Sequence, residues 1–358
     1  MSGLDAVHDE HGATYTERGD RRVVAHYGRP ARAHAAVRKV VGVTERPLGV
    51  VLVEGEDRHE FVDNAVSNAV PSADGRGVYA LLLDPQGRIE TDMYVLTATD
   101  RLLLLTPPGR AGPLAEAWRE KTFIQDVDVR AATEAFAVFG VHGPKATEKI
   151  ASVTSTQTPE DPLTFVRGSM GDAGVTIVRD DGLTGEEGYL VVSATDAARE
   201  VFDTLENRGV NAAPFGLRTW RTLTLEAGTP LFETELADRI PNQLGLRNAV
   251  DFEKGCFVGQ EVVSRIENRG QPSQRLVGLA PERVPAAGAA IFDGDSSVGE
   301  VTRAVESPVL ETPIALAIVD ADAGTELTVR VEGDPVPAER HDLPFVDGSA
   351  VSARLPQY

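Results

Sequence analysis

The most informative stretch of the chain spans residues 251–270 and reads DFEKGCFVGQEVVSRIENRG. Gly255 and Gly259 stand four residues apart, a spacing that allows a tight loop and a close approach by a ligand or by other backbone. From Gln260 onward, apolar residues recur with helical spacing, while Arg265 lies on another side of the expected helix. We call residues 251–270 the cysteine segment, and we predict a loop followed by a helix.

Cys256 is the reactive candidate of this segment, and two interpretations of it stay open. A thiol beside Lys254 and close to a helix N-terminus has its thiolate form favoured, which suits a catalytic or redox role. Alternatively, Cys256 is a small buried hydrophobe and the two glycines only make a turn. Residue spacing alone does not choose between these roles.

The composition limits the partners that the chain can have. The formal net charge is −20, and only five of the 35 basic residues are lysines. An acidic, lysine-poor surface suits a halophilic protein, because salt screens its self-repulsion, although an ordinary acidic protein has the same composition. The negative electrostatic potential of such a protein opposes direct binding of nucleic acid, which depends on basic patches.

The single cysteine excludes an intrachain disulfide and argues against a cysteine-based metal site, so no metal is expected. No apolar run approaches the roughly 18–20 residues that a membrane-spanning helix needs. The polar, acidic N-terminus lacks the basic start and apolar core of a signal peptide. We therefore expect a cytoplasmic protein without a membrane partner.

The first 270 residues predict two similar lobes of the α+β class. Apolar runs at 48–53, 78–83, 89–97 and 102–106 indicate strands, with turn chemistry at 84–87 between the second and the third. Helices are expected before residue 65, near 114–121, after Pro144 and over 197–207. The repeated order of strands and helices indicates two lobes, at 1–140 and 141–270.

Beyond Pro272 the pattern changes to short apolar runs divided by Gly, Pro and Asp. These runs lie at 275–279, 290–292, 298–301, 314–319 and 327–331. Such spacing is typical of a small β-barrel. We therefore predict a third domain at 271–358.

The segment Lys254–Glu261 resembles the K-G-C-[FY]-x-G-Q-E motif of the YgfZ family of folate-binding proteins, and the match extends through Arg265. The motif residues are Lys254, Gly255, Cys256, Gly259, Gln260 and Glu261. Leu223–Pro230 resembles a segment that YgfZ shares with the T-protein of glycine cleavage. Further short matches follow in the same order along nearly the whole chain.

The resemblance implies a ring of two α+β lobes and a C-terminal β-barrel around a central folate channel. YgfZ-like members bind folate and support the assembly or repair of iron–sulfur enzymes, including a tRNA-modifying one. The main expectation is such an accessory role, with folate and iron–sulfur client enzymes as partners. The alternative is a tetrahydrofolate-dependent aminomethyltransferase with a lipoyl carrier protein as partner, and a scaffold that has lost folate is a third hypothesis. Whether the chain is an enzyme stays open.

The resemblance also implies folate contacts. Residues 184–189 resemble the T-G-E-D-G-[FY] segment in which a Glu holds the pterin, so Glu186 and Tyr189 are candidates; an acidic hairpin turn is the other interpretation. Residues 87–94 resemble the segment that carries the T-protein's catalytic Asp, which makes Asp92 a catalytic and folate-binding candidate. Asp92 is equally compatible with an outward-facing strand position.

One further match concerns the folate carboxylate. The position of a folate-contacting Arg in the T-protein is Trp220 here, with Arg221 beside it. Arg221 could pair with the folate carboxylate and Trp220 could stack on a ring, or both belong to an ordinary helix with Trp220 in the core. Tetrahydrofolate, or another reduced folate, is the expected cofactor in either case.

Overall fold

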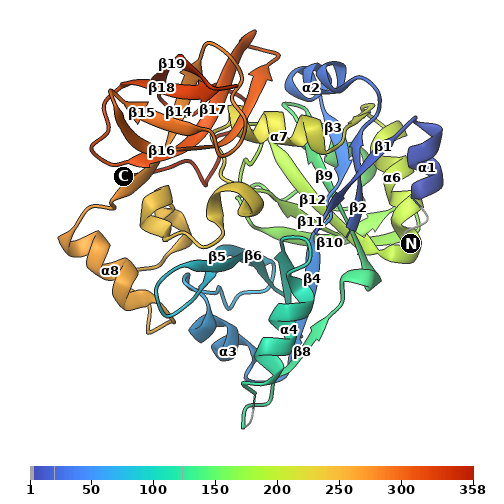
Figure 1. The fold of residues 1–358 in the computed structure, drawn as a ribbon. Coiled ribbons are helices and arrows are strands. Elements are labelled where there is room, and N and C mark those ends of the chain that lie inside the picture. The colour runs from blue at the N-terminus through green and yellow to red at the C-terminus, as the bar shows by residue number, and fades with distance from the viewer. Residues whose placement is uncertain (1–3, 20, 123) are drawn as a thin grey trace.

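The computed structural model describes residues 4–19, 21–122 and 124–358. Two α+β lobes and a closed β-barrel surround a common centre, with the barrel formed by the C-terminal part of the chain (Figure 1). This arrangement confirms the predicted fold class. Within the described ranges, no helix is long and apolar enough to cross a membrane.

The first lobe is built on an antiparallel sheet in the order β5-β6-β7-β4-β8. Its strands are β4 (Gly49–Glu54), β5 (Arg76–Leu83), β6 (Ile89–Thr97), β7 (Leu102–Thr106) and β8 (Asp128–Ala131). Side chains alternate between its two faces. Val51 and Leu104 pack with α3 (Arg58–Ala65) and α4 (Ala111–Arg119), whereas Val50 and Leu105 face the centre of the molecule.

The second lobe contains a sheet in the order β10-β11-β12-β9-β3-β13. Its strands are β3 (Gly42–Glu45), β9 (Phe136–His142), β10 (Phe165–Met170), β11 (Ala173–Arg179), β12 (Gly188–Ala194) and β13 (Ala213–Pro214). Its outer face packs with α1 (Asp5–Glu10), α5 (Ala146–Val153) and α6 (Ala198–Asn207). Leu190 and Val192 of β12 face the centre instead.

The N-terminal residues lead into this second sheet through β3, after a separate two-stranded sheet. They form α1, the hairpin of β1 (Thr14–Arg18) and β2 (Arg21–His26), and α2 (Pro30–Lys39), and they end in β3. Strand β3 pairs with β9, with Gly42 opposite His142. The predicted division at residue 140 therefore needs correction, because the second sheet takes strands from both sides of it.

The barrel has the strand order β14-β17-β16-β15-β18-β19 and closes on itself. Its strands are β14 (Gln274–Pro281), β15 (Ala290–Asp293), β16 (Ser296–Ser307), β17 (Thr312–Asp320), β18 (Glu326–Val331) and β19 (Asp334–His341). The predicted boundary at 271 lies just before β14. The sequence did not predict β19, whose alternation is interrupted by two prolines.

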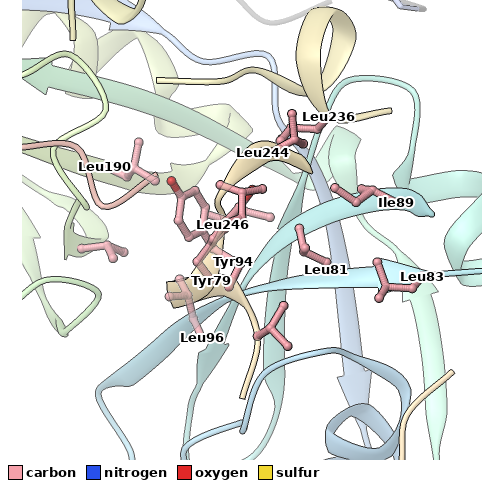
Figure 2. Packing of buried hydrophobic residues seen from close by; sticks show 14 of the residues in the cluster. Tyr79, Leu81, Leu83, Ile89, Tyr94, Leu96, Leu190, Leu236, Leu244 and Leu246 are labelled. Carbon is pink, nitrogen blue, oxygen red and sulfur yellow. The ribbon is translucent and has the colours of Figure 1, made fainter. Parts of the chain in front are cut away.

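The chain between the second sheet and the barrel runs through the centre and ends in a helix at the edge of the molecule (Figure 1). It comprises α7 (Leu217–Glu226), a π-helical turn (Phe232–Leu236), two short 3-10 turns (Pro241–Leu244 and Arg247–Ala249) and α8 (Gln260–Arg269). Figure 2 shows Leu244 and Leu246 of this connection packed with Tyr79 and Tyr94 of the first sheet and Leu190 of the second. One hydrophobic cluster therefore joins both lobes.

The C-terminal tail after β19 returns from the barrel to the lobes. Ala350 N donates to Gly185 O, Ala353 N donates to Asp181 O, and Gln357 N donates to Gly245 O. These main-chain hydrogen bonds hold residues 350–357 across the centre of the molecule. The tail thereby contributes side chains to the site described next.

Candidate functional site

Asp92 lies on β6 and points to the centre of the molecule. Its neighbours at alternate positions, Tyr94 and Leu96, belong to the central cluster, whereas Met93 and Val95 pack under the helices of the first lobe. Asp92 is buried, so the outward-facing interpretation of this position is wrong. The alternation of the strand therefore aims its carboxylate at the interior.

The Asp92 carboxylate has one occupied and one free oxygen. Oδ2 accepts hydrogen bonds from the Tyr79 hydroxyl at 3.0 Å and from Arg354 Nη1 at 2.9 Å. Oδ1 is buried and has no hydrogen-bond partner among the described residues. A buried carboxylate held at one oxygen and free at the other can accept or donate a proton at the free one.

Arg354, from the C-terminal tail, links Asp92 to a second buried carboxylate. Its Nη2 donates to the Tyr94 hydroxyl at 2.6 Å, and that hydroxyl donates to Asp181 Oδ1 at 2.7 Å. Arg354 Nε lies 3.7 Å from Asp181 Oδ2. The guanidinium also lies 3.9 Å from the centre of the Tyr79 ring, a cation–π distance.

Burial controls the electrostatics of this group. It raises the pKa of both Asp92 and Asp181 above the ordinary aspartate value, and the charge of Arg354 opposes part of that rise. Burial also disfavours the charge of Arg354, yet the two tyrosines and the two aspartates beside it hold its pKa well above the ordinary arginine value. Two carboxylates thus share one permanently charged partner, and it is burial that favours proton uptake at the acids while Arg354 opposes it.

Arg46 lies at the end of β3, and its guanidinium stacks 3.6 Å from the centre of the Trp220 ring. Trp220 lies on α7 and is buried in a cluster with Phe215 and Leu223, so the core interpretation of this residue is confirmed. The ring of His142 lies 5.3 Å from the Trp220 ring. An arginine therefore covers the tryptophan face that could otherwise stack on a ligand.

His142 pairs with a third buried acid. Its Nδ1 lies 3.2 Å from Asp180 Oδ2. Burial alone would raise the pKa of Asp180, but His142 and the main-chain N–H of Gly182 lower it below the ordinary value. Gly188 leaves the space for this carboxylate, because a Cβ at that position would lie 2.2 Å from Asp180 Oδ2.

A narrow cavity lies between these groups, and we call it the central cavity. Its walls include Arg18, Arg46, Asp92, Tyr94, Glu233 and Arg354. Its free volume is about 40 Å³, enough for water-sized molecules. Three of its wall residues, Arg46, Asp92 and Arg354, carry buried polar atoms without hydrogen-bond partners among the described residues.

A larger cavity of about 650 Å³ lies between α2, α7 and strand β16 of the barrel. Arg221 lines this cavity and not the central one. Its buried charged groups are paired: His34 contacts Glu226 and Arg303 contacts Glu235. The larger cavity has room for a bigger ligand, and its buried charges are paired. The walls of the central cavity, by contrast, carry buried polar atoms without hydrogen-bond partners among the described residues.

Glu186 lies at a separate polar cluster. Its Oε1 accepts from Arg38 Nη1 at 2.9 Å, and its Oε2 accepts from the main-chain N and the hydroxyl of Ser349. Arg38 also pairs with the buried Glu226, which in turn accepts from the Ser307 hydroxyl. Both Glu186 oxygens are thus engaged, and its predicted pterin contact stays a prediction that this arrangement does not favour.

Tyr189 lies on the outer face of the second sheet. Its side chain packs in the cluster under α5 and α6, and its hydroxyl lies 2.9 Å from the Thr147 hydroxyl. Its neighbour Leu190 faces the centre. The structure therefore does not bring Tyr189, Arg221 or Glu186 together with Asp92.

The cysteine segment lies against the first lobe. Lys254 Nζ donates to the main-chain carbonyls of Asp63, Val66 and Asn68. These hydrogen bonds fix the backbone at the end of α3 and just after it. Burial lowers the pKa of Lys254, and Asp63 opposes that effect. Its ammonium group thus binds backbone of the first lobe, which indicates a structural role for this lysine.

Cys256 is exposed, so the buried-hydrophobe interpretation is wrong. Gly259, with φ +80°, packs on the β5–β6 turn, where a Cβ would lie 2.9 Å from Gly87 Cα. Gln260 begins α8, as predicted. Glu261 and Arg265 form an exposed ion pair on that helix. None of these residues lines the central cavity.

Sequence reasoning missed Arg354, Arg46 and Asp181. Asp180 and Asp181 stand just ahead of the T-G-E-E-G segment, separated from it by two residues, so an acidic pair was visible there, but nothing in the sequence indicated that both are buried. Arg354 lies in a tail without periodic pattern. Only the return of the tail to the lobes makes it part of the site.

Comparisons with known proteins agree with this fold. A family model described as "GCVT N-terminal domain" matches residues 4–254, and one described as "Glycine cleavage T-protein C-terminal barrel domain" matches residues 274–347. The structure of a glycine cleavage system aminomethyltransferase T from Bartonella henselae superposes with a TM-score of 0.88 at 24% identity, covering 98% of both chains. That likeness shows the fold.

Three full-length sequence relatives are named as aminomethyltransferases or probable aminomethyltransferases. The chain is 33% identical to an aminomethyltransferase of Cutibacterium acnes over 96% of this chain and 97% of the relative. It is 33% identical to an aminomethyltransferase of Streptomyces coelicolor over 96% of both chains. It is also 31% identical to a probable aminomethyltransferase of Halobacterium salinarum over 97% of this chain and 98% of the relative.

These relatives overturn one expectation and support another. The YgfZ-like accessory role in iron–sulfur enzyme assembly, inferred from the cysteine segment, is wrong, because full-length relatives are named aminomethyltransferases. The aminomethyltransferase family uses tetrahydrofolate, which agrees with the expected cofactor. With both of its domains matched, the chain belongs to the glycine cleavage T-protein family.

Proposed function

We propose that this chain is a tetrahydrofolate-dependent aminomethyltransferase that takes a one-carbon unit from an aminomethylated lipoyl carrier protein. The observation that supports it most is Asp92, a buried carboxylate with a raised pKa and a free oxygen in the central cavity. Full-length similarity to aminomethyltransferases supports the same reaction class.

The polar atoms around the central cavity match the chemistry of a reduced folate. A pterin presents adjacent N–H donors, which need carboxylate oxygens as acceptors. Asp92 Oδ1, on a residue of the cavity wall, and Asp181 Oδ2, behind it next to Arg354, are buried acceptors without hydrogen-bond partners in the described part of the chain. These two acids would hold the pterin edge in preference to Glu186, whose oxygens Arg38 and Ser349 already engage.

The cavity has to widen for this ligand. Ligand sites of this type measure roughly 300–1,000 Å³, whereas the central cavity has about 40 Å³. Glu233 is an exposed residue of the cavity wall, and it pairs with Arg18 from the β1–β2 hairpin. A shift of this pair would open the cavity without disturbing the buried Asp92–Arg354 contact.

When bound, tetrahydrofolate supplies the amine that accepts the one-carbon unit. Asp92 is placed to hold or move a proton at Oδ1, because Tyr79 and Arg354 fix Oδ2. Arg354 limits the rise of the Asp92 pKa that burial causes, so the carboxylate keeps access to both protonation states. The leucines and tyrosines of the central cluster make the surroundings of this position largely apolar.

The test is a reconstituted assay with aminomethylated lipoyl carrier protein and tetrahydrofolate, run at high and at low salt. Ammonia release that requires both tetrahydrofolate and the carrier supports the proposal. Calorimetric binding of tetrahydrofolate without any release of ammonia, in an assay where a known T-protein is active, contradicts it.

A further inference from the structure

His142 and Asp180 form a buried pair that does not line the central cavity. His142 is the last residue of β9 and is 0% exposed, and Asp180 is 3% exposed. His142 Nδ1 lies 3.2 Å from Asp180 Oδ2. Neither ring nitrogen has a hydrogen-bond partner among the described residues, so this contact is one of opposite charges and not an aligned hydrogen bond.

The second sheet leaves room for this pair. The residues opposite His142 on the two neighbouring strands are both glycines, Gly188 on β12 and Gly42 on β3. A Cβ at residue 188 would lie 2.2 Å from Asp180 Oδ2, and a Cβ at Gly140 would lie 2.5 Å from His142 Nε2. Side chains at residues 140 and 188 would displace the pair, so the sequence of two adjacent strands maintains it.

The buried acids near the centre outnumber the arginine that pairs with them. Asp92, Asp180 and Asp181 are all buried. Arg354 lies 2.9 Å from a carboxylate oxygen of Asp92, and its Nε lies 3.7 Å from Asp181 Oδ2. The partner of the third acid, Asp180, is His142. Two acids therefore share one arginine, and the third has a histidine of its own.

Asp180 is the acid of this group whose charged form is favoured. Burial opposes its charge, yet His142 and the main-chain N–H of Gly182 hold its pKa below the ordinary aspartate value. A buried carboxylate that stays ionised needs a positive partner. We infer that the His142 ring carries both of its protons, as an imidazolium, beside the ionised Asp180.

Other charged groups reach this pair and Asp92 from the neighbouring elements. Those that act on Asp180 are Arg179 of β11, Asp181 and Arg46 at the end of β3. The ring that α7 presents to His142 is the neutral Trp220, at 5.3 Å. Those that act on Asp92 are Tyr79, Arg354 and Glu233.

The charge of Asp180 can reach Asp92 through two intermediates. It adds to burial in raising the pKa of its neighbour Asp181. Asp181 and Asp92 both attract Arg354. If Asp180 lost its positive partner, three acids would depend on one arginine in place of two.

We propose that His142 is a positioning residue of the central site, whose positive charge compensates Asp180 and so leaves Arg354 to Asp92 and Asp181. This inference rests on the proposed function, which makes Asp92 the acid that handles the proton. His142 acts on that acid through the charges between them and does not touch the reacting atoms.

The test follows the titration of the Asp92 carboxyl by ¹³C NMR, in protein labelled at its aspartate carboxyls. The signal is assigned by its loss in Asp92→Asn. The variants are His142→Gln, Asp180→Asn and the double variant that combines them. The matched control is His341→Gln, which changes an exposed histidine at the end of β19. The pH dependence of kcat for ammonia release is measured beside the titration.

His142→Gln should raise the pKa of Asp92 by about 0.5 or more, because it leaves Asp180 as an uncompensated negative charge. Asp180→Asn removes that negative charge and should lower the pKa of Asp92. The double variant removes both charges and should return the pKa to within about 0.3 of the wild type. The acidic limb of the kcat profile should move with the titration, and His341→Gln should change neither.

A purely structural role for His142 gives a different pattern. Both single variants would then move the Asp92 titration in the same direction, and the double variant would depart furthest from the wild type. That pattern, or an unchanged titration in His142→Gln, would overturn the inference. If His142→Gln does not fold, a lowered pKa in Asp180→Asn with a restored one in the double variant supports the inference, and any other result overturns it.

The two proposals fail separately, because the NMR titration does not need turnover. Opposite shifts in the two single variants, combined with a wild type that releases no ammonia, would overturn the proposed function and leave the charge coupling standing. An active wild type whose Asp92 titration does not depend on His142 would overturn only the inference.

Discussion

Arg354 Nη1 donates a 2.9 Å hydrogen bond to Asp92 Oδ2, across a sequence separation of 262 residues. The contact joins the C-terminal tail to strand β6 of the first lobe. It places a permanent positive charge beside the acid that we assign to proton handling. The tail is therefore part of the site, in addition to closing the ring of domains.

Replacing Arg354 with methionine should destabilise the protein by about 3–5 kcal/mol at neutral pH, because it leaves Asp92 and Asp181 buried without their partner. Burial already raises the pKa of both acids. An acid whose folded pKa is raised favours the folded state at low pH and disfavours it as pH rises through that value. The deficit should therefore grow with rising pH.

Guanidinium unfolding of Arg354→Met at several pH values measures this deficit. Arg167→Met, which removes an exposed pair with Asp74, is the control and should change stability by less than about 1 kcal/mol. A free energy of unfolding that matches the wild type at pH 8 would contradict the role assigned to Arg354.

Replacing Glu226 with glutamine should destabilise the protein most at neutral pH. Burial alone would raise the pKa of Glu226, but His34, Arg38 and Ser307 lower it below the ordinary 4.5. An acid with a lowered folded pKa contributes stability above its unfolded pKa, and that stability is lost as pH falls through the folded value. The variant should lose about 3–5 kcal/mol at pH 7 and less below pH 4.5.

The free energy of unfolding of Glu226→Gln, measured at pH 7 and at pH 4, tests this pH dependence. Glu300→Gln removes an exposed carboxylate that pairs with Arg239, and it serves as the control. A deficit that is equal at the two pH values would show that Glu226 is not stabilised as a charged group.

Within the cysteine segment, Lys254 and Cys256 should behave differently. Lys254→Met removes three hydrogen bonds to backbone carbonyls after α3, so it should lower the free energy of unfolding by about 2 kcal/mol or more. Cys256→Ala changes an exposed side chain outside the central cavity. It should leave stability within about 0.5 kcal/mol and leave ammonia release unchanged.

Denaturant unfolding and the reconstituted assay measure both variants side by side. Loss of turnover in Cys256→Ala at normal stability would give the thiol a chemical role that the present arrangement does not provide. Normal stability in Lys254→Met would show that its carbonyl contacts contribute little.

The sequence predicted those elements whose pattern is local. Strands β5 and β6 were predictable because apolar runs flank the turn at 84–87, and the barrel because short runs recur between Gly, Pro and Asp. The face of Asp92 was not predictable, because every residue of the strand except Glu90 is buried and both sets of alternate residues contain apolar side chains. Period-two alternation separates two faces only when one of them meets solvent.

The site depended on long-range contacts that a sequence pattern does not contain. Glu186 was singled out by its motif, but its partners Arg38 and Ser349 lie 148 and 163 residues away and occupy its oxygens. Strand β3 has only four residues, and its pairing with β9 moves the N-terminal segment into the second lobe. The cysteine motif was correctly placed as a loop and helix, but spacing did not reveal its distance from the central cavity.

The measurement that tests the central claim most directly is the rate of tetrahydrofolate-dependent ammonia release by Asp92→Asn, beside the wild type and the exposed control Asp74→Asn. Asparagine keeps the shape of the side chain but cannot exchange a proton at Oδ1, so kcat should fall about 10²–10⁴-fold, while Asp74→Asn retains wild-type activity. An Asp92→Asn variant that turns over at the wild-type rate would contradict the account.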